Sequence, residues 1–427
     1  MRGLLIKNAR LVQPDGIRTG LEVLCRDGRI VLVAAGPADA RGAEVVDAGG
    51  AYLGPGLIDL HIHGCRQWLI DRGAEDLAAV AEALPQYGVT GFLPTVGPLP
   101  PGQDAPFLAA LAAARPRGAE ILGFHLEGPF LALTGALPPG KGVRNLFSPL
   151  TDPQPDGRPR ANGEPEKVPD PFSDAERAKA LIDAARPHRA IFSISPDFED
   201  IERLLPVMTA GGVPAFITHT RATVAQTRRA IELGARHATH FYDVFPSPPE
   251  TEPGVRPCGA VEAVLADERV SVDFILDGVH VDPAAVRVAL QCKGPDRVCL
   301  ITDANVGAGL PAGRYCLADG EEIAFARQGA PARLTRRSRF PGALAGSGLT
   351  MDQAVRNAVK MLGLDVPTAV RLAGLNPARV LGLERSKGRI APGYDADLVL
   401  LDEELHVLRT WVGGQTRYLA RPPAEGR

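Results

Sequence analysis

The sequence has few aromatic and sulfur-containing residues and no excess of charge of either sign. Aromatic residues make up 5% of the 427 positions, so we expect a core of Ala, Val, Leu and Ile. The six cysteines are scattered and form no Cys-x-x-Cys pair, which excludes a disulfide framework and favours reduced thiols. Lysine and arginine total 47 against 50 aspartates and glutamates. This balance gives no electrostatic reason to expect binding to nucleic acid or to an anionic membrane.

Long apolar segments and nucleotide-binding loops are also missing. No apolar run reaches the roughly 18 residues that a membrane span needs, and the N-terminal segment lacks the apolar region and cleavage site of a signal peptide. We therefore expect a cytoplasmic protein with no membrane partner. Neither GxGxxG nor GxxxxGKS/T follows the first strand-like run of the central block, which argues against a doubly wound nucleotide-binding fold.

The two ends of the chain resemble each other and differ from its middle. Residues 1–54 and 386–427 consist of short β-type runs separated by Asp-Gly, Gly-Gly and Pro-Gly turns, which predicts one small β-sandwich built from both termini. Between them, in residues 55–385, eight apolar strand-like runs alternate with Ala-rich amphipathic segments. Eight strand–helix steps favour a closed (β/α)8 TIM-type barrel.

Two irregular segments interrupt this alternation. Residues 132–172 are rich in Pro and Gly and too long for an ordinary connection, so we expect a loop over the mouth of the barrel. Residues 308–345 are predicted to form one or two β-hairpins.

Metal-binding residue types recur at the carboxyl ends of the predicted barrel strands. Residues two apart on a strand share a face, and barrel active sites lie at the carboxyl ends of the strands, so these side chains should converge. Imidazole and carboxylate together suit Zn, Fe or a similar divalent ion. The converging set is His61, His63, Glu127, His219, His240 and Asp303.

Other nearby residues have simpler interpretations. His125 alternates with Glu127 but is followed by the rigid Gly128-Pro129, and we interpret it as structural. His237 is interpreted in the same way, and Cys65 as a small buried residue beside the site. A single His-x-His is weak evidence, so the prediction of a metal centre depends on the whole set.

Eight motifs resemble the amidohydrolase superfamily and, within it, the N-acetylglucosamine-6-phosphate deacetylase group. They occur in order over nearly the whole chain, and this order makes the resemblance specific. The motifs are PGLIDLHIHG (55–64), HLEGPF (125–130), THTRAT (218–223), HATHFYDVF (237–245), DGVHVDP (277–283), LITDA (300–304), LAGSGLTMDQAVRN (344–357) and NPARVLGLERSKGRIAPGYDADLVLLD (376–402).

The resemblance implies a role for each of these residues. It implies that Glu127, with His219 and His240, holds one divalent metal, and that His61 and His63 allow a second. It further implies that Asp303 is the general base and acid. His280 is expected to bind the substrate carbonyl, and the protein is expected to form a homodimer.

The chemistry of amide hydrolysis agrees with these roles. A divalent metal lowers the pKa of bound water from about 15.7 to about 7, which makes a nucleophile available at neutral pH. Asp303 can accept the proton of that water and deliver it to the leaving nitrogen. His280 and the metal stabilise the developing negative charge on the carbonyl oxygen, an effect typically worth a few kcal/mol.

The positions that should contact the substrate depart from the group's pattern. Asp243-Val244 replaces Asn-Ala, and Thr251 replaces an Arg that reaches the sugar phosphate of a neighbouring subunit. Arg144 stands where the group has a His that touches the sugar. An added carboxylate and a lost bidentate cation both weaken phosphate binding. Arg144 or Arg256 is a candidate replacement cation.

These observations lead to one principal expectation and two alternatives. We expect a metal-dependent amidohydrolase that removes the acetyl group from N-acetylglucosamine 6-phosphate or a related amino sugar. An alternative substrate is a different N-acyl compound, unphosphorylated or cationic, that pairs with Asp243. A second alternative is a metal-binding assembly subunit without catalysis, which the complete set of ligand-type residues disfavours.

Overall fold

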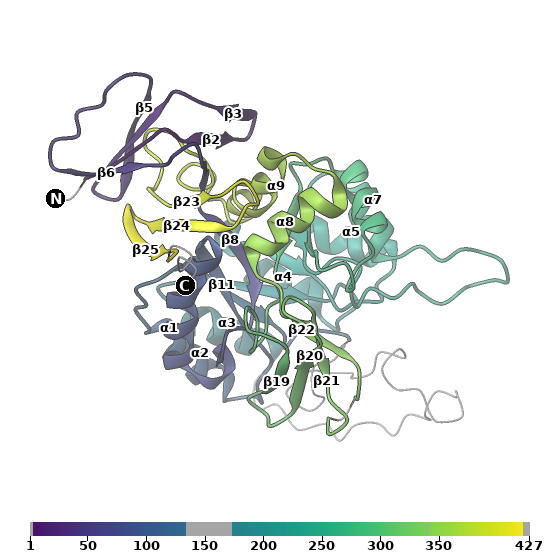
Figure 1. Ribbon diagram of the computed structural model, residues 1–427. Helices are drawn as coiled ribbons and strands as arrows, with labels where there is room; N and C mark the ends of the chain where they lie inside the picture. Colours follow the sequence, from purple (N-terminus) through teal and green to yellow (C-terminus); the bar gives the residue numbers. More distant parts are fainter. Residues whose placement is uncertain (1–2, 134–172, 339, 422–427) are drawn as a thin grey trace.

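The computed structural model describes residues 3–133, 173–338 and 340–421. A parallel sheet of eight principal strands curves into a nearly closed barrel (Figure 1). This barrel and the terminal β domain described below confirm the fold class expected from the sequence. The eight strands are β8 (Leu57–Ile62), β11 (Val89–Val96), β13 (Phe124–Glu127), β14 (Ala190–Ile194), β15 (Ala215–Ile217), β16 (Ala235–Ala238), β17 (Ser271–Ile275) and β18 (Val298–Ile301).

Every principal strand except β16 and β17 is buried along its whole length, as expected for a sheet covered on both faces. The barrel closes where the backbone N–H of Asp303 donates to the carbonyl of His61 and where Ile62 bridges Ala304. A short strand, β12 (Glu120–Ile121), pairs with the outer part of β11.

Helices follow the strands and cover the outside of the barrel. Their starts follow local rules. For example, the Thr223 hydroxyl accepts the N–H of Gln226 while the Gln226 side chain accepts the N–H of Thr223, a reciprocal cap that begins α5. The helices are α1 (Ala74–Ala83), α2 (Asp104–Ala112), α3 (Asp174–Ala184), α4 (Ile201–Met208), α5 (Val224–Glu232), α6 (Ala260–Ala266), α7 (Pro283–Lys293), α8 (Met351–Leu362), α9 (Val366–Ala373) and α10 (Leu375–Val380).

The two chain ends build a separate β domain at one side of the barrel (Figure 1). Its core lies between two sheets and includes the fully buried Trp411. One sheet has the order β5-β4-β1-β6, with β1 (Gly3–Lys7), β4 (Glu22–Arg26), β5 (Arg29–Ala34) and β6 (Ala43–Asp47). The other has the order β25-β24-β23-β7-β2-β3, with β2 (Arg10–Gln13), β3 (Gly16–Arg18), β7 (Tyr52–Pro55), β23 (Leu398–Leu401), β24 (Val407–Val412) and β25 (Gln415–Leu419).

A buried lysine joins the β domain to the barrel. The Nζ of Lys387 lies 2.7 Å from a carboxylate oxygen of Glu120 on β12 and 2.7 Å from one of Asp397. Asp395 adds a third carboxylate at 3.0 Å. We call these four residues the lysine cluster.

The domain boundaries suggested by the sequence (1–54, 55–385 and 386–427) stay predictions.

A third, smaller sheet follows β18. It has the order β19-β20-β21-β22, with β19 (Gly313–Cys316), β20 (Glu322–Phe325), β21 (Pro331–Leu334) and β22 (Leu344–Ser347). The expected hairpins are therefore one four-stranded antiparallel sheet. The loop expected at 132–172 lies, from residue 134 on, outside the described residues. No helix among the described residues is long and apolar enough to cross a membrane. The expected cytoplasmic location stays a prediction.

Candidate metal centre

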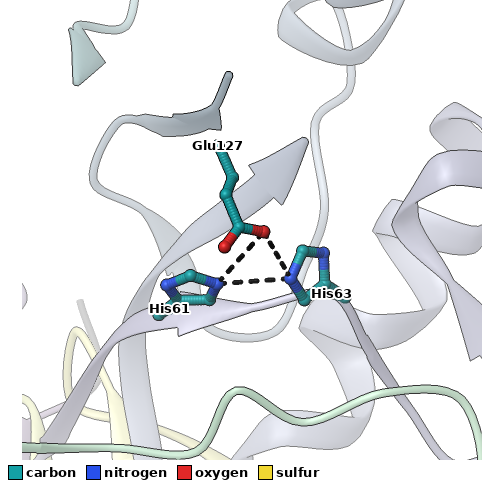
Figure 2. A group of neighbouring side chains, drawn as sticks. All are labelled: His61, His63 and Glu127. Atoms are coloured by element: carbon teal, nitrogen blue, oxygen red, sulfur yellow. Dashed lines mark hydrogen bonds and ion pairs between the residues drawn. The ribbon is translucent and has the colours of Figure 1, made fainter. Parts of the chain in front are cut away.

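Five of the predicted site residues meet at the carboxyl end of the barrel. Glu127 lies at the centre, at the end of β13. Its Oε1 is 3.2 Å from Nε2 of His219 and 3.2 Å from Nε2 of His240. Its Oε2 is 3.2 Å from Nε2 of His63 and 3.7 Å from Nε2 of His61. Glu127 therefore lies between two pairs of imidazoles, and Figure 2 shows the pair from β8 and the residue after it.

The donor atoms have the chemistry and spacing of a metal site. The two Nε2 atoms of His61 and His63 lie 3.2 Å apart. Donors bound to a tetrahedral ion at about 2.0 Å are about 3.3 Å from one another, so the contacts of 3.2 Å fit one ion in each donor set. Each set contains two imidazoles and shares the Glu127 carboxylate. The residues present therefore fit a divalent metal, and two such ions can share Glu127.

The local electrostatics keep the central carboxylate ionised. Burial alone raises the pKa of Glu127, but the charge of His61 and hydrogen bonds from His219 and His240 outweigh it and hold the pKa well below its usual range. For His240, burial lowers the pKa, while the hydrogen bond and charge of Glu127 raise it to about 9. An ionised carboxylate is the form that binds a cation.

A layer of polar side chains below the cluster orients the imidazoles. The Nδ1 of His61 is 3.2 Å from the buried Thr239 hydroxyl, which leaves Nε2 for the cluster. The backbone N–H of His240 donates to one oxygen of Asp273, and the other oxygen is 2.7 Å from Nε2 of His237. All these groups are buried inside the barrel, so His237 supports the site from below rather than joining a donor set.

His125 and Cys65 also lie outside both donor sets. The Nδ1–H of His125 donates to the carbonyl of Leu60 at 3.0 Å, and its Nε2 accepts from the Ser193 hydroxyl at 2.6 Å. Both ring nitrogens are therefore used inside the barrel. Cys65 is buried nearby, on the short strand β9 (Gly64–Cys65).

Asp303 lies on the His61–His63 side of the cluster. Its Oδ1 is 3.5 Å from Nε2 of His61 and 3.4 Å from Nε2 of His63. Its backbone is held from both sides, because its N–H donates to His61 and its carbonyl accepts the N–H of Ser347 at 2.7 Å. A Cβ on Gly346 would lie 2.7 Å from the Asp303 carbonyl, so this close approach requires glycine.

Three of the converging residues have strained backbones. His219, His240 and Asp303 have φ of 48°, 35° and 44°, a region that non-glycine residues seldom adopt. Each follows the end of a strand, where the left-handed turn redirects the side chain. Such strain concentrates at functional sites because the surrounding contacts enforce it.

Asp243 and His280 lie within electrostatic range of this cluster. The charge of Asp243 raises the pKa of both His240 and His280, and Asp303 also acts on His280. Asp243 is half-buried and lies between Tyr242 and Val244, whose φ values are 76° and 55°. A β-branched residue at positive φ is a genuine outlier, so the backbone around Asp243 is tightly constrained.

Of the two candidate phosphate-binding cations, only Arg256 lies among the described residues, and no printed contact joins it to the cluster. Arg256 is exposed, in the loop 246–258 between β16 and α6, and pairs with Glu262 at 3.1 Å. Thr251 is exposed in the same loop, which projects from the barrel in Figure 1. Arg144 lies outside the described residues.

Several residues that support the site were not predicted from the sequence. Asp59 had a detectable signal, because it alternates with His61 and His63 on one strand and so shares their face. Its carboxylate accepts the Thr302 hydroxyl at 2.6 Å. Asp277 had a weaker signal, three residues before His280. Gly346 and Ser347 lie in one of the eight motifs, but their contact with Asp303 was not predicted, because it joins distant parts of the chain.

The comparisons with known proteins agree with this geometry. The model of the amidohydrolase family matches residues 52–417. The chain belongs to the amidohydrolase family. This amidohydrolase is a hydrolase of carbon–nitrogen bonds other than peptide bonds, as the sequence motifs predicted.

Two curated relatives match the amidohydrolase over nearly its full length. It is 30% identical over 417 residues to the N-acetylgalactosamine-6-phosphate deacetylase of Escherichia coli O157:H7, which covers 96% of this chain and 98% of the relative. It is 30% identical over 425 residues to the N-acetylglucosamine-6-phosphate deacetylase of Lysinibacillus sphaericus, with 97% of each chain covered.

A solved structure matches the amidohydrolase to a similar extent. The N-acetyl-D-glucosamine-6-phosphate deacetylase of Mycobacterium smegmatis superposes with a TM-score of 0.79 at 29% identity, over 97% of this chain and 99% of that one. The resemblance predicted from the motifs is therefore confirmed at the level of family and fold.

Proposed function

We propose that this amidohydrolase removes the acetyl group from an N-acetylated amino-sugar 6-phosphate such as N-acetylglucosamine 6-phosphate. The observation that carries the proposal is the Glu127 carboxylate between two imidazole pairs, with Asp303 beside one pair. The relatives that match the whole chain support the substrate class, since their names specify acetylated amino-sugar phosphates.

We propose that the site holds two divalent ions, Zn or Fe. His61, His63 and Glu127 would hold one, and Glu127, His219 and His240 the other. When bound, a divalent ion supplies water of lowered pKa and polarises the acyl carbonyl. Chelation should abolish activity, and Zn²⁺ or Fe²⁺ added back should restore it. Less than about 0.2 equivalents of metal after reconstitution would exclude this proposal.

The chain's own residues carry the proton transfers. Asp303 accepts a proton from the attacking water, whose oxygen forms a bond to the acyl carbon. Asp303 then delivers this proton to the nitrogen as the C–N bond breaks, which releases acetate and the free amine. His280 donates a hydrogen bond to the acyl oxygen, where negative charge develops.

We propose Arg221 as the cation that recognises the phosphate. It follows His219 by two positions at the carboxyl end of β15 and is half-buried. Its backbone N–H donates to Asp197 at 3.2 Å, which fixes the turn. Its guanidinium has no ion pair or hydrogen bond with any described residue. A half-buried cation with no partner in the described part of the chain is well suited to an anionic group of the substrate.

Asp243 favours a second candidate function. Its half-buried carboxylate has no hydrogen bond or ion pair from a side chain of the described residues, and its charge reaches both His240 and His280. A phosphate placed beside it would be repelled, whereas a cationic or hydroxyl-bearing group would be attracted. The second candidate is therefore deacylation of an unphosphorylated or cationic N-acyl compound.

Acetate release from phosphorylated and free N-acetylglucosamine separates the two candidates. The first predicts a kcat/KM of about 10⁴ M⁻¹s⁻¹ or more for the 6-phosphate, at least about 100-fold above the free sugar. Arg221→Ala should lower this ratio by about 10-fold or more, because a charge-assisted hydrogen bond is worth about 1.5–3 kcal/mol. Arg228→Ala, on the exposed side of α5, is the matched control. Better turnover of the free sugar or of a cationic amide would support the second candidate instead.

We also propose a homodimer. The exposed loop 246–258, which projects from the barrel, offers a surface to a second copy, and the oligomeric state can be measured by light scattering.

A further inference from the structure

The Asp277 carboxylate holds His280 through three hydrogen bonds. Asp277 lies two residues after β17. One of its oxygens accepts the backbone N–H groups of Val279 at 2.8 Å and of His280 at 2.9 Å. The other oxygen is 2.8 Å from Nδ1 of the His280 ring. Neither side chain is more than 1% exposed, so the pair is shielded from solvent.

This arrangement determines what the His280 ring can donate. An ionised carboxylate only accepts, so Nδ1 of His280 must carry a hydrogen. The other nitrogen, Nε2, then has a lone pair in the neutral ring and an N–H only in the protonated ring. A lone pair would repel an acyl oxygen. Donation to that oxygen therefore requires His280 to be a cation.

The charges around His280 favour the cation. Burial lowers the pKa of His280, but the hydrogen bond and charge of Asp277 outweigh it and raise the pKa above its usual value. Asp243, from the segment after β16, and Asp303, after β18, add further negative charge. The three carboxylates come from segments that follow three different strands.

We propose that Asp277 is a positioning residue that holds His280 as a charged donor to the acyl oxygen of the substrate. This inference rests on the proposed function, in which His280 contacts that oxygen. Asp277 acts on the reaction only through His280, because its own oxygens are occupied by the ring and by two backbone N–H groups.

The isosteric variant Asp277→Asn tests the proposal. The Asn oxygen can still accept the two backbone N–H groups, while its amide donates to Nδ1 and reverses the tautomer. His280 then presents a neutral N–H, and we expect kcat to fall by about 10- to 100-fold. The alkaline fall in activity caused by His280 deprotonation should disappear. Metal content and KM should stay within about 2-fold of wild type.

A double-mutant cycle distinguishes positioning from a general structural role. In a His280→Asn background, Asp277→Asn should change kcat by less than about 2-fold. An equal loss in both backgrounds, or a wild-type kcat and pH profile in Asp277→Asn, would overturn the inference. Asp282→Asn, which affects only the cap of α7, is the control and should leave kcat unchanged.

Two other results also decide the inference: a variant that does not fold and a wild type without activity. If Asp277→Asn fails to fold, the pH profile of His280→Asn decides, because loss of the same alkaline limb is then expected and its retention contradicts the inference. The assays use whichever N-acyl substrate the wild type hydrolyses. A wild type inactive on every amide would overturn the proposed function together with this inference, whereas an active wild type with a failed cycle overturns the inference alone.

Discussion

Two clusters of titratable side chains in this molecule differ in how their members contact one another. In the lysine cluster, the buried Lys387 contacts three carboxylates, of which Glu120 is exposed and Asp395 also pairs with Arg29 at 3.0 Å. In the candidate metal centre, four imidazoles surround one carboxylate. The lysine cluster is complete within the chain. The imidazoles and Glu127 have the composition of a site for a cation from outside the chain, as proposed above, whereas the contacts of Lys387 join opposite charges within the chain.

Removal of the shared carboxylate should have the largest effect. Glu127→Gln should lose most of the bound metal and lower kcat/KM by at least about 1,000-fold, because a catalytic metal supplies several kcal/mol of transition-state stabilisation. Metal analysis and steady-state kinetics measure both effects. Asp303→Asn is the contrasting variant: it should keep its metal and still lose about 100- to 10,000-fold in kcat. Full activity in either variant would contradict the assignment.

Removal of the central cation of the lysine cluster should affect stability and not catalysis. Lys387→Met leaves the buried Asp397 without its cation, and we expect a loss of about 3 kcal/mol in the free energy of unfolding. Metal content and kcat should match wild type at temperatures where the variant is folded. Lys360→Met, at an exposed position on α8, is the matched control. A stable variant with altered metal content would show that the two clusters are not separate in function.

A third group of potential ligands should have the smallest effect. Asp402, Glu404 and His406 also lie within reach of one another, but Glu404 and His406 are exposed. Solvated side chains of this kind commonly occur without an ion. His406→Ala should leave metal stoichiometry unchanged and change the free energy of unfolding by less than about 0.5 kcal/mol. A lost equivalent of metal would refute this distinction.

The sequence allowed the barrel and the convergence of its ligand-type residues to be predicted, because both depend on local patterns. Continuous apolar runs such as VCLI predict strands buried on both faces, and β18 forms there. Residues at the ends of such runs must meet at one rim. His61, His63, Glu127, His219 and His240 therefore converge as expected.

The remaining features depend on contacts that no local pattern specifies. The close approach of Gly346 to Asp303 brings the last strand of the inserted sheet back to the segment that precedes the sheet. The supporting hydroxyl of Thr239 was not predicted, because threonine also fits an ordinary buried strand. The orientation of the His280 ring could not be predicted, because it depends on three hydrogen bonds that the Asp277 carboxylate accepts.

The hydrogen bond from the Ser347 N–H to the Asp303 carbonyl links the candidate site to a strand that comes much later in the sequence than the imidazoles. The imidazoles and Glu127 leave the ribosome well before β22, whose last residue supplies the N–H that holds the Asp303 backbone. A nascent barrel can therefore assemble its metal-binding side chains while Asp303 still lacks one of its two backbone restraints. The second restraint on the Asp303 backbone forms only once β22 lies beside the segment after β18, so the inserted sheet belongs to the scaffold of the candidate site.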